Sequence, residues 1–225
     1  MIDFSSPEYL EARWRVKINH FTEQGLQING IVHVGTNDGY EMHWYKMMGI
    51  KHLIGVEPLP SAQELFGQKH PDLPLFGYAL SDHDGIGVLH PTEGDGQGSS
   101  LLIDAKPNPD YKFLPDVHVI VRRWDSIVRE SVGFDFGLYD CLVMDVQGYE
   151  WEALHGFGDQ LKHFNMINVE LSEEPIYVGG RPAREVVEWL ATQGFNIDSP
   201  ITEHDDVFFI REGLEVPFPG RRIQP

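Results

Sequence analysis

The sequence has little cysteine, little positive charge and no long hydrophobic run. Cys141 is the single cysteine among 225 residues, so an internal disulfide is excluded and nothing indicates an oxidising compartment. No apolar run approaches the length of a membrane-spanning helix. Residues 1–9 contain acids and lack the apolar core of a signal peptide. We therefore expect a cytoplasmic protein without a membrane span.

Positive charge is scarce, because 17 lysines and arginines stand against 35 aspartates and glutamates, for a net charge of −18. Such a field repels the phosphates of nucleic acids and anionic membranes, so we expect no nucleic acid partner. A small or neutral substrate fits this charge better. The simpler explanation is that an acidic surface keeps a protein soluble, so the charge alone assigns no function.

Two phosphate-binding motifs are also missing. A Walker loop would need a glycine followed by Lys-Ser or Lys-Thr, and the sequence has no such step. The G-x-G-x-x-G turn of dinucleotide-binding proteins is replaced by Gly35-Thr-Asn-Asp-Gly39, where Asn37 takes the place of the glycine that a pyrophosphate needs. A pyrophosphate cofactor is therefore disfavoured, and a cofactor without phosphates, such as S-adenosylmethionine, remains.

The pattern that is present is typical of a cofactor site at the end of two strands. The apolar run Ile31–Val34 breaks into the glycine-bracketed turn, and a helical pattern follows. A second apolar run, Leu53–Val56, ends on Glu57. An acid at this point is placed to accept hydrogen bonds from a ribose diol, and the turn lets the backbone approach a ligand closely.

Short apolar runs alternate with amphipathic stretches along the chain, which predicts an α/β fold with a mainly parallel sheet. The length suits one domain with a full core. The last two predicted strands form an antiparallel pair. The seven core strands are predicted at Ile31–Val34, Leu53–Glu57, Leu75–Leu80, Tyr139–Met144, Met166–Leu171, Phe195–Ile197 and Val207–Arg211.

Amphipathic stretches predict helices between these strands. They cover Pro7–His20, Tyr40–Met48, Pro60–Lys69, Trp124–Arg129, Gly148–Leu154 and Arg181–Gln193.

The middle of the chain, residues 81–116, is rich in glycine, proline and aspartate. Ile86–His90 and Ser99–Ile103 are predicted as short strands beside a flexible loop, and Val117–Val121 as a strand outside the core sheet. A long insertion of this kind is either functional or a solvated surface excursion, and the sequence leaves both open.

Three acids end apolar runs and so lie at one rim of the predicted sheet: Glu57, Asp145 and Glu170. Open α/β sheets bind ligands beyond the carboxyl ends of their strands. A buried carboxylate is costly unless it is paired or hydrogen-bonded, so three on one rim favour a site. The alternative is that one or two of them cap neighbouring helices.

Taken together, these segments resemble the FkbM-type S-adenosylmethionine-dependent methyltransferases. The turn Val34–Tyr40 corresponds to the family's V-G-A-N-x-G, and Met144–Glu150 corresponds to D-V-E-G-x-E. The resemblance runs in order from about Ile31 to Phe209. The remaining matching segments are Val56–Pro60, Ala79–Asp82 with Gly85, Ser99–Leu101, Arg123–Asp125 and Val169–Glu170.

The resemblance implies a Rossmann-like, seven-strand class I methyltransferase sheet with helices on both faces. It implies S-adenosylmethionine as methyl donor and a hydroxyl of a sugar or secondary metabolite as acceptor, hence a small-molecule partner. Residues 1–225 would then be one methyltransferase domain, with a helical extension (1–30), a catalytic core (31–212) and a tail (213–225).

The resemblance also implies roles for individual residues. Gly35, Asn37, Asp38 and Gly39 would bind the methionine portion of the donor, and Glu57 its ribose. Ser81 and Asp82 would lie near the adenine, with Ser100 bordering the same pocket, and Asp145 would sit where the methyl leaves.

Two positions depart from the family pattern. His33 stands where the family has an acid that anchors the donor's amino end. It is either a core histidine or a replacement for that acid through a water molecule, and we favour the core histidine. Gln147 replaces the family's usual glutamate, so any role of that charge is absent here.

Asp145 and Glu170 are the candidate catalytic residues by position. Asp145 either acts as a metal-free base toward the acceptor hydroxyl or ligates a divalent metal that lowers the pKa of that hydroxyl, with Glu170 completing the metal site. The metal-free base is our working hypothesis. N-methylation of a similar substrate is one alternative, and a cofactor-binding module without turnover is another. The sequence carries no indication of the oligomeric state.

Overall fold

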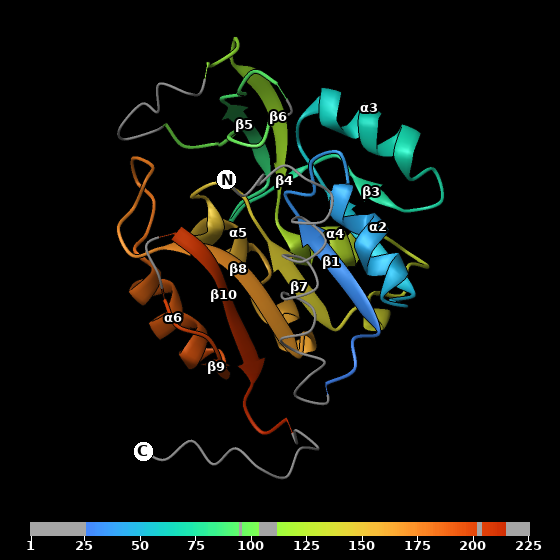
Figure 1. Cartoon of the computed structure of the whole chain (residues 1–225), viewed down its shortest axis with the longest axis vertical. Helices are drawn as coiled ribbons and strands as arrows, with labels where there is room; N and C mark the ends of the chain where they lie inside the picture. Colours follow the sequence, from blue (N-terminus) through green and yellow to red (C-terminus); the bar gives the residue numbers. More distant parts are fainter. Residues whose placement is uncertain (1–25, 95, 104–111, 202–203, 215–225) are drawn as a thin grey trace, which may run out of the picture.

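The centre of the molecule is a seven-stranded sheet with the strand order β3-β2-β1-β7-β8-β10-β9 (Figure 1). The computed structural model describes residues 26–94, 96–103, 112–201 and 204–214. The predicted helix Pro7–His20 lies outside this part of the chain, as do most of the extension (1–30) and of the tail (213–225). The strands are β1 (Gly30–Val34), β2 (His52–Val56), β3 (Leu75–Phe76), β7 (Cys141–Met144), β8 (Met166–Ser172), β9 (Phe195–Ile197) and β10 (His204–Arg211).

Pairing in this sheet is parallel except at one strand. Neighbours from β3 to β8 run parallel, whereas β10 is antiparallel to both β8 and β9. The predicted fold class, a mostly parallel sheet with an antiparallel last strand, is therefore confirmed. From β1 the chain first builds the sheet toward β2 and β3, and it later returns on the other side of β1 as β7. In open α/β sheets, ligands bind where the strand order reverses in this way.

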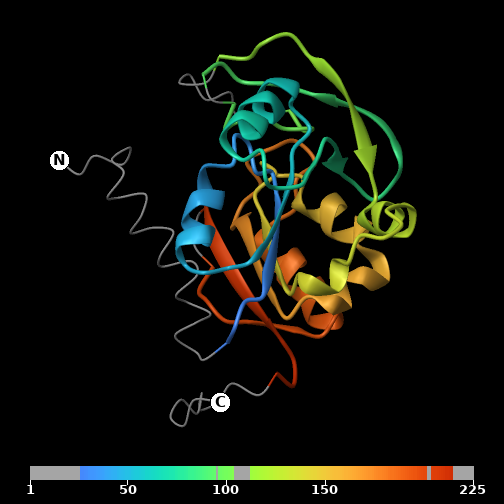
Figure 2. The same cartoon turned by 90° about the vertical axis from the view of Figure 1, so that its right-hand side faces the viewer.

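Helices cover both faces of the sheet, because alternate strand residues point to opposite sides. Ile31 of β1 packs in a layer with Tyr45 and Phe66, whereas Val32 packs in a layer with Trp124 and Leu154. In Figure 2 the blue α2 and the orange helices lie on opposite sides of the sheet. The first layer contains α2 (Tyr40–Met47) and α3 (Pro60–Lys69), and the second contains α4 (Trp124–Glu130), α5 (Glu150–Gly156) and α6 (Ala183–Thr192).

A second, three-stranded sheet stands beside the first, with the order β4-β6-β5. Its strands are β4 (Ala79–Leu80), β5 (Gly85–Leu89) and β6 (Val117–Arg122). The strand predicted at Val117–Val121 therefore lies outside the core sheet, as expected, and Ile86–His90 corresponds to β5.

The prediction of a single strand at Leu75–Leu80 was wrong, because this segment is divided between the two sheets. Its first half is β3, which pairs with β2, and its second half is β4, which pairs with β6. The chain turns between them, where the Tyr78 N–H donates to the carbonyl of Phe76 over 2.9 Å.

The strand predicted at Ser99–Ile103 was also wrong. The only β-pairing in this segment is an isolated antiparallel bridge between His90 and Ser100. The Ser100 hydroxyl instead donates to the Gln147 carbonyl (2.7 Å) and accepts from the Leu102 N–H (2.9 Å), so the segment bends toward the end of β7.

The helix after β7 begins at Glu150 and not at the predicted Gly148, because Gln147 and Gly148 both have left-handed backbones (φ 54° and 95°). Within the described ranges, no helix combines the length and apolarity needed to cross a membrane.

The packing of α5 against the second sheet can be tested at Gly156. A Cβ on this residue would lie 2.1 Å from the carbonyl oxygen of Ser81, so Gly156→Ala must push backbone apart. We expect a loss of about 1–3 kcal/mol in the free energy of unfolding, as for other overpacked cores, measured by urea denaturation.

Gly67→Ala is the matched control, because Gly67 is also helical and a Cβ there would meet nothing within 4 Å. This variant should gain roughly 0.5–1 kcal/mol through helix propensity. Equal stability of the two variants would contradict the close contact between α5 and Ser81.

Candidate functional site

A cavity of about 640 Å³ lies at the carboxyl ends of β1, β2, β7 and β8. Its wall combines the turns that follow these strands with residues of the second sheet and the segment 96–101. The residues that line it are Val34, Gly35, Asn37, Asp38, Tyr40, Glu41, Val56–Leu59, Tyr78–Leu80, Leu89, Gly96, Gln97, Ser99–Leu101, Asp145–Gln147, Tyr149 and Glu170. The predicted rim acids Glu57, Asp145 and Glu170 therefore share one cavity.

The turn after β1 is fixed by a close backbone contact. Gly35 has a left-handed backbone (φ 79°), and a Cβ on it would lie 1.8 Å from the carbonyl oxygen of Asp145. The Gly35 N–H donates to Val56, and the Asp145 N–H donates to Val34. No side chain larger than hydrogen fits here, so the ends of three neighbouring strands are held against one another at the floor of the cavity.

Glu57 is a buried carboxylate held by two backbone donors. Its Oε2 accepts from the Asn37 N–H (2.9 Å), and its Oε1 accepts from the Leu59 N–H (2.8 Å). The pKa of Glu57 is raised to about 7, because burial and, to a smaller extent, the charge of Asp145 raise it by more than the two hydrogen bonds lower it. Because a carboxylate offers about four acceptor positions, these bonds leave capacity for a diol.

Asp145 and Glu170 are joined by the side chain of Gln147. The Gln147 Nε2 donates to Asp145 Oδ1 over 2.7 Å and to Glu170 Oε2 over 3.0 Å. Tyr177 donates its hydroxyl hydrogen to Gln147 Oε1 over 2.8 Å, which fixes which end of the amide faces the acids. The residue that appeared in the sequence only as a lost charge thus links the two predicted catalytic residues.

Glu170 is held in its neutral form. Burial, the charge of Asp145 and a hydrogen bond with Asp145 together raise the pKa of Glu170 far above its usual range. Two adjacent carboxyl groups cannot both ionise cheaply, so the pair keeps one proton at neutral pH.

A divalent metal does not fit this donor set. Among the residues that the structure describes, no group of three or more histidine, cysteine, aspartate or glutamate side chains could hold a metal ion. The two carboxylates instead converge on an amide nitrogen of Gln147, whose hydrogens would face a cation.

The other predicted cofactor residues divide into two sets. Asp38 and Ser100 line the cavity, and Asp38 also accepts from the Tyr40 N–H (3.0 Å) and pairs with Lys69. Gly39 is absent from the wall. A Cβ on it would meet the rings of Phe66 and His70 on the side of α3.

Ser81 and Asp82 are likewise absent from the wall. The buried Ser81 hydroxyl lies 3.1 Å from the hydroxyl of Tyr149, a wall residue, so Ser81 stands behind it. Asp82 is exposed and pairs with His83. The cofactor contacts of Gly39, Ser81 and Asp82 stay predictions.

His33 is buried between β1 and α2, with its Nδ1 3.3 Å from the hydroxyl of Tyr45. This position agrees with its interpretation as a core histidine. Three further residues at the site could not be identified from the sequence: Tyr149 and Gln97 line the cavity, and Tyr177 is bonded to Gln147. Of these, only Tyr149 lies inside one of the family-like motifs.

Comparison with known proteins agrees with this architecture. The family model of the methyltransferase FkbM domain matches residues 33–197. The 2-O-methyltransferase NoeI of Sinorhizobium fredii (strain NBRC 101917 / NGR234) is 27% identical over 173 residues, which cover 71% of this chain and 70% of that protein.

Two solved structures share the fold. The O-methyltransferase TomG of Streptomyces achromogenes, in complex with SAM, aligns with a TM-score of 0.50 at 15% identity, covering 88% of this chain and 80% of TomG. The ribosomal protein L11 methylase of Lactobacillus delbrueckii subsp. bulgaricus aligns with a TM-score of 0.50 at 10% identity, covering 91% and 79%.

The buried acids predict that stability falls as pH rises. Glu150 is buried near Asp145, and burial raises its pKa to about 7. A carboxyl group whose pKa is raised by folding contributes stability below its unfolded value, near pH 4.5, and loses it as pH rises through 7. Glu150→Gln keeps an oxygen for the N–H groups of Val146 and Gly148 and should reduce the fall in melting temperature between pH 5 and pH 8.

The control for this measurement is Glu64→Gln, since Glu64 is exposed on α3. It should keep the wild-type pH slope. An unchanged slope in Glu150→Gln would show that Glu150 does not bind its proton more tightly in the folded state.

Proposed function

The chain belongs to the methyltransferase FkbM domain family, and we propose that it transfers a methyl group from S-adenosylmethionine to a hydroxyl oxygen of a sugar or secondary metabolite. The observation that carries this proposal is the placement of Asp145 and Glu170, joined by Gln147, in the same cavity as Glu57. The name of the relative, a 2-O-methyltransferase, supports oxygen as the acceptor atom.

The donor side of the cavity fits a nucleoside that lacks phosphates. Gly35 has no side chain, and its backbone lies close to the carbonyl of Asp145. At the end of β2, the Glu57 carboxylate accepts two backbone hydrogen bonds and can accept further ones from a ligand. Gly35, Asn37 and Asp38 would hold the amino acid portion, and Glu57 would hold the ribose hydroxyls. When bound, S-adenosylmethionine supplies a methyl group that its sulfonium already activates for transfer.

The acceptor side needs a base and a means of orienting a hydroxyl. Asp145 would accept the hydroxyl proton, because Glu170 already carries the proton of the pair. The Gln147 amide and the Tyr177 hydroxyl would keep the carboxylate oriented. The protein's main contribution is alignment of the acceptor oxygen, since the methyl needs no further activation. This version of the mechanism uses no metal.

Two alternatives remain tied to the same site. An amine acceptor would use the same alignment, and release of S-adenosylhomocysteine with paired hydroxyl and amine compounds separates oxygen from nitrogen transfer. A binding module without catalysis would bind the donor and turn over no acceptor.

Replacement of Asp145 tests the base. Asp145→Asn removes the proton acceptor while keeping the shape of the side chain, so turnover should fall roughly 10²–10⁴-fold. The measurement is release of S-adenosylhomocysteine at saturating donor, with EDTA and with added magnesium. Asp159→Asn, an exposed change of the same type, should retain wild-type turnover.

Wild-type turnover in Asp145→Asn would rule out both a base and a metal-ligand role. Loss of wild-type turnover in EDTA, restored by magnesium, would rule out the metal-free mechanism alone.

Replacement of Glu57 tests the donor site. In Glu57→Gln, an amide NH₂ must face either the Asn37 or the Leu59 N–H, and the charged acceptor for the ribose is lost. We expect the dissociation constant for S-adenosylhomocysteine, measured by calorimetry, to rise roughly 10–100-fold. Glu64→Gln should bind as the wild type does. Unchanged affinity in a folded Glu57→Gln protein would place the ribose elsewhere.

A further inference from the structure

We propose that Gln147 is a positioning residue for the Asp145–Glu170 pair, and that the site requires an amide and not a carboxylate at this position. This inference rests on the proposed methyl transfer and extends it to the residues that fix the geometry of the base. It follows from three anchors of Gln147: its amide nitrogen, its amide oxygen and its backbone carbonyl.

The amide nitrogen of Gln147 serves two acids at once. Nε2 carries two hydrogens and donates to Asp145 Oδ1 over 2.7 Å and to Glu170 Oε2 over 3.0 Å. A carboxyl group of the same shape carries at most one hydrogen, so a glutamate here would leave at least one of the two acids without its donor. Once ionised, it would also add a negative charge beside them. Both hydrogen bonds together therefore require an amide.

The amide oxygen of Gln147 is held by a residue that follows β8. The Tyr177 hydroxyl donates to Oε1 over 2.8 Å, and the Tyr177 side chain is buried. Its ring packs on Gly148, where a Cβ would lie only 2.4 Å from the ring carbon Cδ2. Tyr177 is thus seated against the backbone next to Gln147, and its hydroxyl keeps the nitrogen end of the amide toward the two acids.

The backbone of Gln147 is held in an unusual conformation. Its φ of 54° is left-handed, which residues with a side chain rarely adopt unless their surroundings impose it. The Gln147 carbonyl accepts from the hydroxyl of Ser100 over 2.7 Å, and that hydroxyl in turn accepts from the Leu102 N–H over 2.9 Å. Ser100 therefore braces the residue that orients the acids.

The two segments that hold Gln147 are joined to each other. The Val178 N–H donates to the carbonyl of Ile103 over 2.8 Å, which links the segment of Tyr177 to the segment of Ser100. A change in either segment should therefore reach the acids through Gln147.

Two variants test this role, and each keeps the shape of the side chain. With an acceptor that the wild type turns over, at saturating donor and in EDTA, Gln147→Glu should lower kcat roughly 10–100-fold, because the base loses its orientation. Tyr177→Phe removes one hydrogen bond and should lower kcat roughly threefold to tenfold. The dissociation constant for S-adenosylhomocysteine should stay within about twofold of the wild-type value in both variants.

The constant donor affinity separates positioning from a general loss of structure. The Asp145 carbonyl lies against Gly35 at the floor of the cavity, so a collapse around Gln147 would disturb the donor side as well. A fall in kcat together with unchanged donor binding is therefore the signature of a positioning role.

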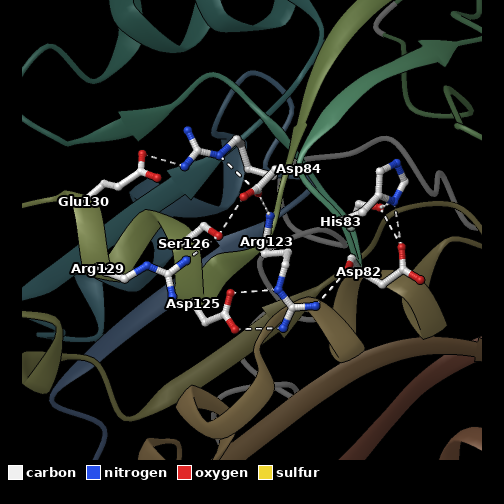
Figure 3. A network of polar contacts seen from close by, with 10 residues as sticks. Asp82, His83, Asp84, Arg123, Asp125, Ser126, Arg129 and Glu130 are labelled. Carbon is white, nitrogen blue, oxygen red and sulfur yellow. Dashed lines mark hydrogen bonds and ion pairs between the residues drawn. The ribbon is translucent and has the colours of Figure 1, made fainter.

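Ser126→Ala is the matched control for Tyr177→Phe, because it also removes a buried hydroxyl from a polar network. Figure 3 shows this network, in which the Ser126 hydroxyl donates to Asp84 over 2.7 Å and accepts from Arg129 over 2.9 Å. These three residues are not part of the cavity wall. Ser126→Ala should lower the melting temperature, as Tyr177→Phe does, while keeping the wild-type kcat.

A double-mutant cycle tests whether the tyrosine acts through the amide. In a Gln147→Ala background the Tyr177 hydroxyl has no amide oxygen to hold. Adding Tyr177→Phe to Gln147→Ala should therefore change kcat by less than about twofold.

The outcomes separate this inference from the proposed function. Wild-type kcat in a folded Gln147→Glu protein would overturn the inference and leave the methyl transfer intact. Equal effects of Tyr177→Phe in the two backgrounds would also overturn it, as would an equal fall in kcat for Ser126→Ala. If Gln147→Glu does not fold, Tyr177→Phe and the cycle decide. Donor binding by the wild type without turnover of any acceptor would defeat the proposed function, and this inference with it.

Discussion

The whole site depends on one steric constraint, the contact between the backbone at Gly35 and the carbonyl of Asp145. Because no side chain fits there, β1 and β7 can end side by side, and the turns that follow them open into a common space. The Val56 carbonyl ties the same turn to β2. The turn after β1 and Glu57 on one side and Asp145 and Glu170 on the other thus line one cavity, at the point where the strand order reverses.

The buried acids at and beside this cavity are held by different neighbours. Glu57 is anchored by backbone donors, Glu150 by the N–H groups of the turn before α5, and Glu170 by its neighbour Asp145. Burial penalises the ionised form of all three. The stability of the fold is therefore expected to depend on pH, and the same burial places acids with raised pKa values in and beside the cavity.

The main sheet and the donor turn could be predicted from the sequence because their signals are local. Apolar runs of strand length mark β1, β2, β7 and β8, and Asn37 between two glycines distinguishes the turn. The division of Leu75–Leu80 could not be predicted, since a continuous apolar run suits one strand as well as two. The link through Gln147 was missed for another reason: its partners come from β8 and from the segment after it, and only folding brings them together.

The break between β3 and β4 divides the wall of the cavity between two sheets. The strands β1, β2 and β3, which precede this break, belong to the sheet that carries the turn after β1 and Glu57, whereas β4, β5 and the segment 96–101 supply a separate part of the wall. A substitution in that part changes the wall without touching the contact at Gly35. One part of the cavity wall is therefore attached to a different sheet from the contact that fixes its floor.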